Sequence, residues 1–144
     1  MPRTLIVAVT GVVFLFLSAL HMYWARGGRW GSQVTVPNKG GRPLFTPSAR
    51  ATIIVALLLL MAATILLLRI RVPSNPPLEF ITRCGAWVLT AVFVLRAAGD
   101  FHWIGFFKTV HDGGFARLDT WVYSPLCLLL ALGSAVAART AFSR

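Results

Sequence analysis

The stretch Ala51–Leu68 reads ATIIVALLLLMAATILLL and contains no charged side chain. A second uncharged run, LIVAVTGVVFLFLSAL, covers Leu5–Leu20. Because an α-helix rises 1.5 Å per residue, about 18–20 apolar residues match a hydrocarbon core roughly 30 Å thick. Hydrophobic residues make up 57% of the 144-residue chain and charged residues only 12%, an apolar excess unusual for a soluble domain. The sequence therefore predicts an integral membrane protein.

We predict an all-α fold, a four-helix transmembrane bundle in one domain over residues 1–144, with spans at about 4–24, 47–70, 80–99 and 120–139. The first run is too long for a signal-peptide core and lacks a small-residue cleavage site, so we expect a retained helix. Thr46-Pro47 predicts the start of the second span, as an N-cap followed by proline. In the fourth, Pro125 indicates either a kink or a helix that begins at Ser124 after a separate LDTWVY segment.

A long loop separates the first two spans and is rich in Gly and Pro. It also carries large apolar side chains, which favour an ordered loop against the membrane (Trp30, Val34, Val36, Leu44 and Phe45). In the fourth span, small residues recur at helical spacing and predict a close helix contact, within the bundle or in a homo-oligomer (Ala131, Ser134, Ala135 and Ala138).

Lysine and arginine number 14 against four acids, giving a formal net charge of +10. The basic residues flank apolar runs, as expected beside anionic lipid head groups, so the bilayer is the expected partner and nucleic acid is not. Charge divides almost evenly between the two faces. The face of the termini carries six of the 14 lysines and arginines and the long-loop face eight, but three of those eight can belong to a site (Arg96, Lys108 and Arg117). Without them the count is six against five, which favours cytoplasmic termini in a bacterial inner membrane. Cys84 and Cys127 fall near opposite faces, which argues against a disulfide between them.

Four spans place most of the polar residues on one membrane face. That face receives all three histidines (His21, His102 and His111) and every acid except Glu79. Arg96 and Asp100 are four residues apart, so on a continuing helix they would form an ion pair on one side. Lys108 has no carboxylate in helical register nearby. Since charges near hydrocarbon are costly, this clustering predicts a polar pocket at one interface.

Four segments of the chain together resemble an uncharacterised family of small four-span bacterial membrane proteins (HMYWARGG, LRAAGDFHWIGFFK, FARLDT and YSPLCL). The resemblance covers nearly the whole chain. It implies the four-span topology and a set of shared polar positions (His21, Tyr23, Trp24, Arg96, Asp100, Lys108 and Asp119), but it implies no activity. The VHDGG segment at 110–114 departs from the family pattern, so His111 and Asp112 carry less weight.

Our leading hypothesis is a pocket that binds or acts on an amphiphilic, lipid-like small molecule. Arg96 and Lys108 would hold an anionic head group, and aromatic rings would pack its apolar part (Tyr23, Trp24 and Trp103). The candidates for acid–base catalysis are His21, Asp100 and Asp119.

Three alternatives remain open from the sequence. A haem or metal site could use His21 with His102 or His111, although no Cys-x-x-Cys or His-x-x-x-His spacing is present and we predict no metal ligands. A transporter would require oligomerisation, and no inverted repeat supports one. A structural or accessory subunit of a membrane complex would use the polar cluster only to lock its own bundle. No cofactor can be named.

Overall fold

The computed structural model describes residues 2–39, 42–71, 76–111 and 113–139. Within them, four helical stretches are long and apolar enough to cross a membrane. They are α1 (Pro2–Ala25), α2 (Ala49–Arg71), α3 (Pro76–Ala98) and a continuous stretch formed by α4 (Gly114–Leu118), η2 (Asp119–Tyr123) and α5 (Ser124–Arg139). The predicted all-α, four-span architecture is confirmed, and the chain is an integral membrane protein.

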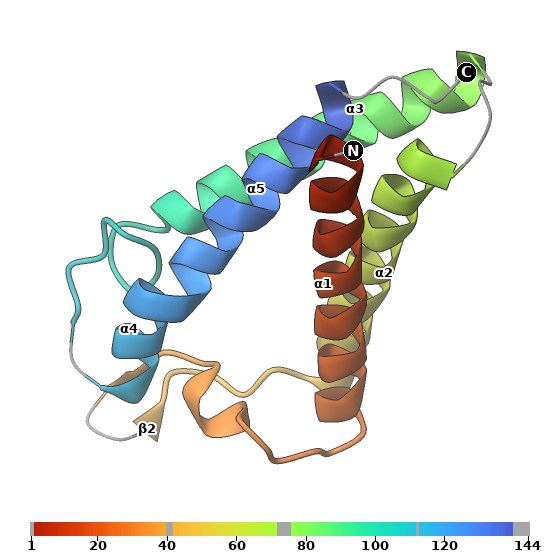
Figure 1. The fold of residues 1–144 in the computed structure, drawn as a ribbon. Coiled ribbons are helices and arrows are strands. Elements are labelled where there is room, and N and C mark those ends of the chain that lie inside the picture. Colours follow the sequence, from red (N-terminus) through yellow and green to blue (C-terminus); the bar gives the residue numbers. More distant parts are fainter. Residues whose placement is uncertain (1, 40–41, 72–75, 112, 140–144) are drawn as a thin grey trace.

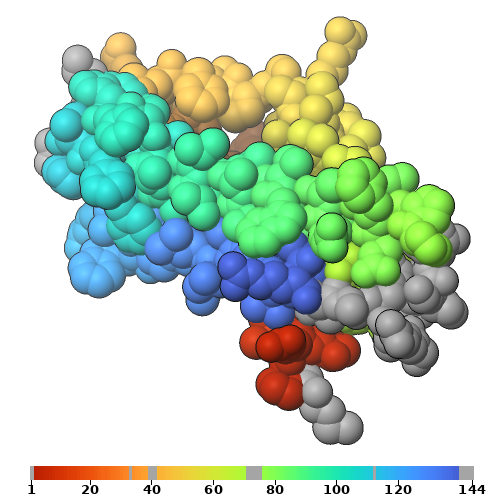
Figure 2. Space-filling model, turned by 90° about the horizontal axis from the view of Figure 1, so that it is seen from above, coloured from red at the N-terminus to blue at the C-terminus, as the bar shows by residue number. Residues whose placement is uncertain are grey.

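The helices form two antiparallel pairs, α1 with α2 and α3 with α5 (Figure 1). The space-filling view also shows α3 and α5 running alongside each other (Figure 2). The two pairs meet near the beginning of α1 and diverge toward the long loop, which passes beneath them (Figure 1). This divergence leaves the loop-bearing face to be closed by the connecting segments rather than by the helices.

The core lies where the two pairs cross. The Phe14 and Phe93 rings join α1 to α3 across the two pairs, with centroids 5.2 Å apart. Within the first pair, Ser18 on α1 donates a 2.7 Å hydrogen bond to the Ala56 carbonyl oxygen on α2. The buried apolar residues come from all four spans (Val7, Phe14, Leu59, Ala62, Ala63, Leu66, Ala86, Leu130, Ala137 and Ala138). Packing at this crossing therefore fixes the bundle from which the loops extend.

Two helix starts differ from the predicted ones. The second span begins at Ala49 rather than at residue 47, because the Ser48 hydroxyl accepts a hydrogen bond from the Ala51 N–H at 3.2 Å and caps the helix. The third span begins at Pro76 rather than near residue 80. Proline fits the first turn of a helix, whose N–H groups have no intrahelical partner.

Pro125 is accommodated by a π-helical turn. Residues Asp119–Tyr123 form η2, and the Ser124 N–H bonds back to the Asp119 carbonyl oxygen across five residues. The wider turn carries the helix past a proline that has no N–H and would crowd the preceding turn. The segment LDTWVY is thus helical and continuous with α5, and Asp119 occupies the π turn itself.

The loop after α1 is ordered where it is described. It contains the 3-10 turn η1 (Ser32–Val34) and two short antiparallel strands, β1 (Asn38–Lys39) and β2 (Arg42–Pro43). The Tyr123 hydroxyl donates a 3.1 Å hydrogen bond to the Val34 carbonyl oxygen, 89 residues earlier in the chain. The loop is therefore tied directly to the π turn.

The small residues of α5 pack inside the chain. Ala131, Ser134 and Ala138 are buried, and a Cβ added at Gly133 would collide with the Thr10 side chain on α1. Close helix approach within the bundle is thus what these residues provide. A homo-oligomer through this helix stays a prediction.

Candidate functional site

A buried charge cluster joins the end of α3 to the π turn. The Asp119 side chain is fully buried, and its Oδ1 accepts a 2.9 Å hydrogen bond from Arg96 Nη2. Its Oδ2 accepts bonds from Lys108 Nζ at 3.1 Å and from the Gly105 N–H at 2.7 Å. Lys108, only 4% exposed, also donates to Thr120 Oγ1 at 2.6 Å. Every oxygen of the buried carboxylate is thus hydrogen-bonded, as a buried charge requires.

This arrangement explains Lys108, which had no carboxylate in helical register. Its partner is Asp119, 11 residues away in sequence. The cluster holds two cations and one carboxylate, and Arg96 Nη1 is buried without a hydrogen-bond partner among the described residues. Thr120, which is not among the predicted site residues, also belongs to the cluster as an acceptor for Lys108 Nζ. No sequence spacing identifies it, because Lys108 and Thr120 are 12 residues apart and meet only when the turn after α3 packs on the π turn.

The predicted ion pair between Arg96 and Asp100 is wrong. The helix ends at Ala98, and Gly99 adopts a left-handed φ of 92°, which turns the chain away before Asp100. Asp100 Oδ1 instead accepts hydrogen bonds from three backbone N–H groups, those of His102 (2.9 Å), Trp103 (2.7 Å) and Ile104 (2.9 Å). Asp100 therefore organises a tight turn, while Arg96 is left for Asp119.

The electrostatics of Asp100 follow from this turn. Burial raises the pKa of its carboxyl group, but the hydrogen bonds from Ile104, His102 and Trp103 favour the ionised form and hold the pKa below the ordinary value of 3.8. Asp100 is exposed and ionised at neutral pH. The ionised Asp100 carboxylate therefore stabilises the turn that follows α3.

The turn returns the chain onto the end of α3. The Phe106 N–H donates a 2.8 Å hydrogen bond to the Ala97 carbonyl oxygen, which lacks a partner within the helix. A Cβ at Gly99 would collide with the Ile104 carbonyl oxygen, and a Cβ at Gly105 with the Ala98 carbonyl oxygen. The two glycines thus permit a close backbone contact that positions Gly105 and Lys108 against Asp119.

A separate group of predicted residues ends α1. His21 Nδ1 lies 2.8 Å from the Leu17 carbonyl oxygen, and Trp24 Nε1 donates to the Trp30 carbonyl oxygen at 2.8 Å. The Gly28 N–H bonds the Tyr23 carbonyl oxygen at 3.0 Å, and a Cβ at Gly28 would collide with the Tyr23 ring. The HMYWARGG motif therefore caps the helix and directs the chain into the loop.

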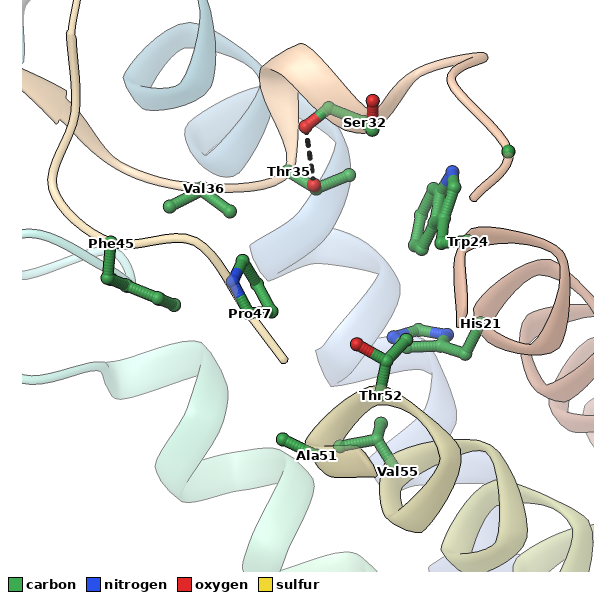
Figure 3. Close-up of a pocket in the computed structure, with 11 residues that line it drawn as sticks. His21, Trp24, Ser32, Thr35, Val36, Phe45, Pro47, Ala51, Thr52 and Val55 are labelled. Atoms are coloured by element: carbon green, nitrogen blue, oxygen red, sulfur yellow. Dashed lines mark hydrogen bonds between the residues drawn. The ribbon is translucent and has the colours of Figure 1, made fainter. Parts of the chain in front are cut away.

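A cavity of about 430 Å³ lies between these helix ends and the loop (Figure 3). His21 and Trp24 come from the end of α1, Thr52 and Val55 from the first turns of α2, and the remaining lining residues largely from the loop (Gly28, Ser32, Thr35, Val36, Phe45, Pro47 and Ala51). In Figure 3 the loop residues Ser32, Thr35 and Val36 lie across the space from Thr52 and Val55. The lining is mostly apolar with a few hydroxyl groups and one imidazole.

The predicted site residues therefore fall into distinct places. His21 and Trp24 line the cavity, Tyr23 lies beside it at the end of α1, and Arg96, Lys108 and Asp119 form the cluster. Asp100 and Trp103 belong to the turn, where the Trp103 ring meets the His102 ring edge-on at a centroid distance of 4.9 Å. His111 is exposed, and Asp112 lies outside the described residues. Thr52 and Val55 were not predicted as site residues, since both lie inside an apolar span.

Two further observations concern the hypothesis of a metal site and the predicted absence of a disulfide. Within the described part of the chain, no three His, Cys, Asp or Glu side chains gather as a metal-binding group. Cys84 and Cys127 are both free thiols.

Residues 14–134 match the family described as "Protein of unknown function (DUF3995)". Comparisons with curated proteins and with solved structures give no match. The matched segment contains the end of α1, the turn after α3, the charge cluster and the π turn, and it covers most of the chain. The protein therefore belongs to the DUF3995 family, whose function is unknown.

Proposed function

We propose that the protein binds an amphiphilic, lipid-like small molecule in the cavity between the long loop and the ends of α1 and α2. The observation that carries the proposal is the cavity's lining. Its volume of about 430 Å³ falls within the roughly 300–1,000 Å³ typical of small-ligand sites, and such sites combine apolar walls with a few polar groups.

His21 supplies the main polar contact in this proposal. A carbonyl oxygen only accepts hydrogen bonds, so the contact with Leu17 assigns the proton to Nδ1. In the neutral ring, Nε2 is then an acceptor, and it makes no hydrogen bond to a described residue. A hydroxyl head group that donates to Nε2, with its apolar part against Val36, Val55 and Phe45, fits this lining.

The charge cluster acts in this proposal as a positioning device. Asp119 anchors the π turn, and Tyr123 in the same turn binds the Val34 carbonyl oxygen. Thr35 and Val36 follow directly and line the cavity. Arg96, Lys108 and Asp119 would therefore hold one wall of the site in place rather than contact the ligand's apolar part.

The test is to purify the protein in detergent, extract bound small molecules with organic solvent and quantify them by mass spectrometry. Val55→Trp fills the cavity, whereas Ile54→Trp adds the same side chain at a neighbouring position that does not line it. We expect Val55→Trp and His21→Ala to lower the amount of a specific co-purifying amphiphile about tenfold or more, and Ile54→Trp to leave it unchanged.

Equal retention of the extracted molecule by both tryptophan variants would overturn the proposal. So would an extract of the wild-type protein that holds only the bulk lipids of the membrane, in their bulk proportions. Circular dichroism of each variant checks that its helices have formed.

We also propose that the protein resides in the inner membrane with the start of α1, the end of α2 and the end of α5 in the cytoplasm. Single cysteines test this in a background without Cys84 and Cys127. Arg42→Cys lies on the loop face and Arg3→Cys near the start of α1, and both positions are exposed. A membrane-impermeant maleimide should label residue 42 but not residue 3 in intact cells, and the reverse pattern would invert the topology.

A further inference from the structure

A second cleft lies on the opposite membrane face. Its volume is about 450 Å³, and it is formed by the end of α2, the beginning of α3 and the end of α5 (Arg69, Glu79, Arg83, Cys84, Trp87, Ala138 and Arg139). The loop cavity lies at the other end of α2, so the two sites are on different faces of the membrane. Nothing in the proposed function uses this cleft.

Three arginines give the cleft a positive charge. Arg69 is 1% exposed, and its Nε donates to the Ala137 carbonyl oxygen at 2.7 Å while Nη1 donates to the Glu79 carbonyl oxygen at 3.2 Å. These two acceptors and the Thr82 hydroxyl orient the guanidinium, and the nearby Glu79 carboxylate on α3 partly offsets its charge. The Glu79 carboxylate forms no ion pair with any residue that the structure describes. Three cations against one acid leave a net excess of positive charge.

The other two arginines are exposed at the cleft's edge. The Arg139 guanidinium lies over the Trp87 ring, 5.6 Å from its centroid, a cation–π geometry that fixes a flexible side chain. Arg83 is one turn away from Glu79 on α3 and is exposed. A rigid planar guanidinium suits bidentate binding of phosphate oxygens.

The surroundings of the cleft are apolar. On α3, Phe80, Ile81 and Val88 are 63%, 64% and 60% exposed, as expected for side chains that face acyl chains. Trp87 beside them is a residue type enriched at membrane interfaces. A ligand here would therefore meet cationic groups at one end and a lipid-facing helix surface at the other.

We propose that this cleft binds the phosphate head group of an anionic phospholipid, with Arg83 and Arg139 contacting the phosphate, Arg69 supplying buried positive charge and the acyl chains lying along α3. Basic pockets between membrane helices bind anionic head groups, and each arginine near an anionic membrane surface contributes about 1 kcal/mol of attraction. The exposed apolar surface of α3 favours a phospholipid over a free anion.

The test is native mass spectrometry of the full chain in detergent, titrated with phosphatidylglycerol or phosphatidylcholine at constant ionic strength. We expect one phosphatidylglycerol to bind with clear preference over phosphatidylcholine. Arg83→Gln with Arg139→Gln should weaken that binding roughly 30-fold. The matched control, Arg3→Gln with Arg50→Gln, removes two exposed arginines outside the cleft and should leave it within about twofold.

Glu79→Gln should change the affinity for phosphatidylglycerol in the opposite direction. Removing the one acid among the described residues of the cleft should strengthen phosphatidylglycerol binding about fivefold, which a purely structural role for these residues does not predict. The proposal would be overturned if the protein bound both lipids equally well. It would also be overturned if the cleft and control variants lost the same affinity for phosphatidylglycerol, or if Glu79→Gln did not raise that affinity. Displacement of the lipid by inorganic phosphate at low millimolar concentration would instead identify a free-anion site and would also overturn it.

Discussion

Arg96 at the end of α3 donates a 2.9 Å hydrogen bond to Asp119, which lies 23 residues later in a π-helical turn and has a fully buried side chain. Lys108 binds the other carboxylate oxygen. Arg96 and Lys108, which lie on different segments of the chain, thus both bind the buried carboxylate of Asp119. The turn after α3, the π turn and, through Tyr123, the long loop all depend on this point.

Asp119→Asn should destabilise the protein by about 3–5 kcal/mol, because it leaves the Lys108 ammonium buried without a compensating charge. Thermal unfolding in detergent, followed by intrinsic fluorescence, measures the effect as a fall in apparent Tm. Glu79→Gln is the matched control, since it makes the same chemical change at an acid without an ion pair to any described residue. Similar Tm values for the two variants would show that the cluster does not stabilise the fold.

Lys108→Met should cost less stability in the Asp119→Asn background than in the wild-type protein. In the wild type it removes a satisfied ion pair, whereas in the variant it removes the unpaired buried charge itself. Contacting residues of this kind show coupling energies of about 0.5–3 kcal/mol. A double-mutant cycle on the free energy of unfolding measures the coupling, and strict additivity would contradict direct pairing of Lys108 with Asp119.

The sequence predicted the spans well because the hydrocarbon thickness sets a length that an uncharged run such as Ala51–Leu68 must match. Helix ends were predicted less well. The third span was predicted from about residue 80 but begins at Pro76, because proline fits the first turn of a helix. In the π turn, Pro125 is compatible with a kink, a new helix or a wider turn, and only the surrounding contacts decide among them.

The pairing of charges depends on tertiary structure that helical spacing does not contain. The four-residue separation of Arg96 and Asp100 is meaningful only on a continuing helix, and Gly99 ends that helix with a φ of 92°. The real partner of Arg96 becomes available only when the turn and the π segment pack together. The cavity could not be predicted from the sequence either, because its walls come from the loop and from apolar positions of α2.

Acidification should weaken the turn at Asp100. The folded-state pKa lies below the ordinary value of 3.8, so the ionised carboxylate stabilises the fold above about pH 4, and this contribution is lost as the pH falls through the folded-state pKa. Tm measured from pH 7 to pH 3 should therefore fall more steeply in the wild type than in Asp100→Asn, whose amide does not titrate. Parallel curves would show that ionisation of Asp100 does not support the turn.

Gly105→Ala should be more damaging than Gly27→Ala, although both glycines have nearly the same left-handed φ, 88° and 89°. A Cβ at Gly27 meets nothing within 4 Å, so its cost is the left-handed conformation alone, about 1–2 kcal/mol. At Gly105 a Cβ also collides with the backbone of Ala98 and Gly99, which no side-chain rotation relieves. That collision would displace the Gly105 N–H from Asp119 Oδ2.

The comparison therefore separates backbone conformation from packing, since conformation contributes equally to both variants. Tm in detergent gives the ranking, and we expect the fall for Gly105→Ala to exceed that for Gly27→Ala clearly. Combining Gly105→Ala with Asp119→Asn tests the stated cause. If the collision acts by breaking the hydrogen bond to Asp119, the combined loss will be smaller than the sum of the two single losses. Equal losses for the two alanine variants would mean that the turn accommodates the added methyl group, and the close contact between Gly99 and Gly105 would then not be what holds Lys108 against the buried carboxylate.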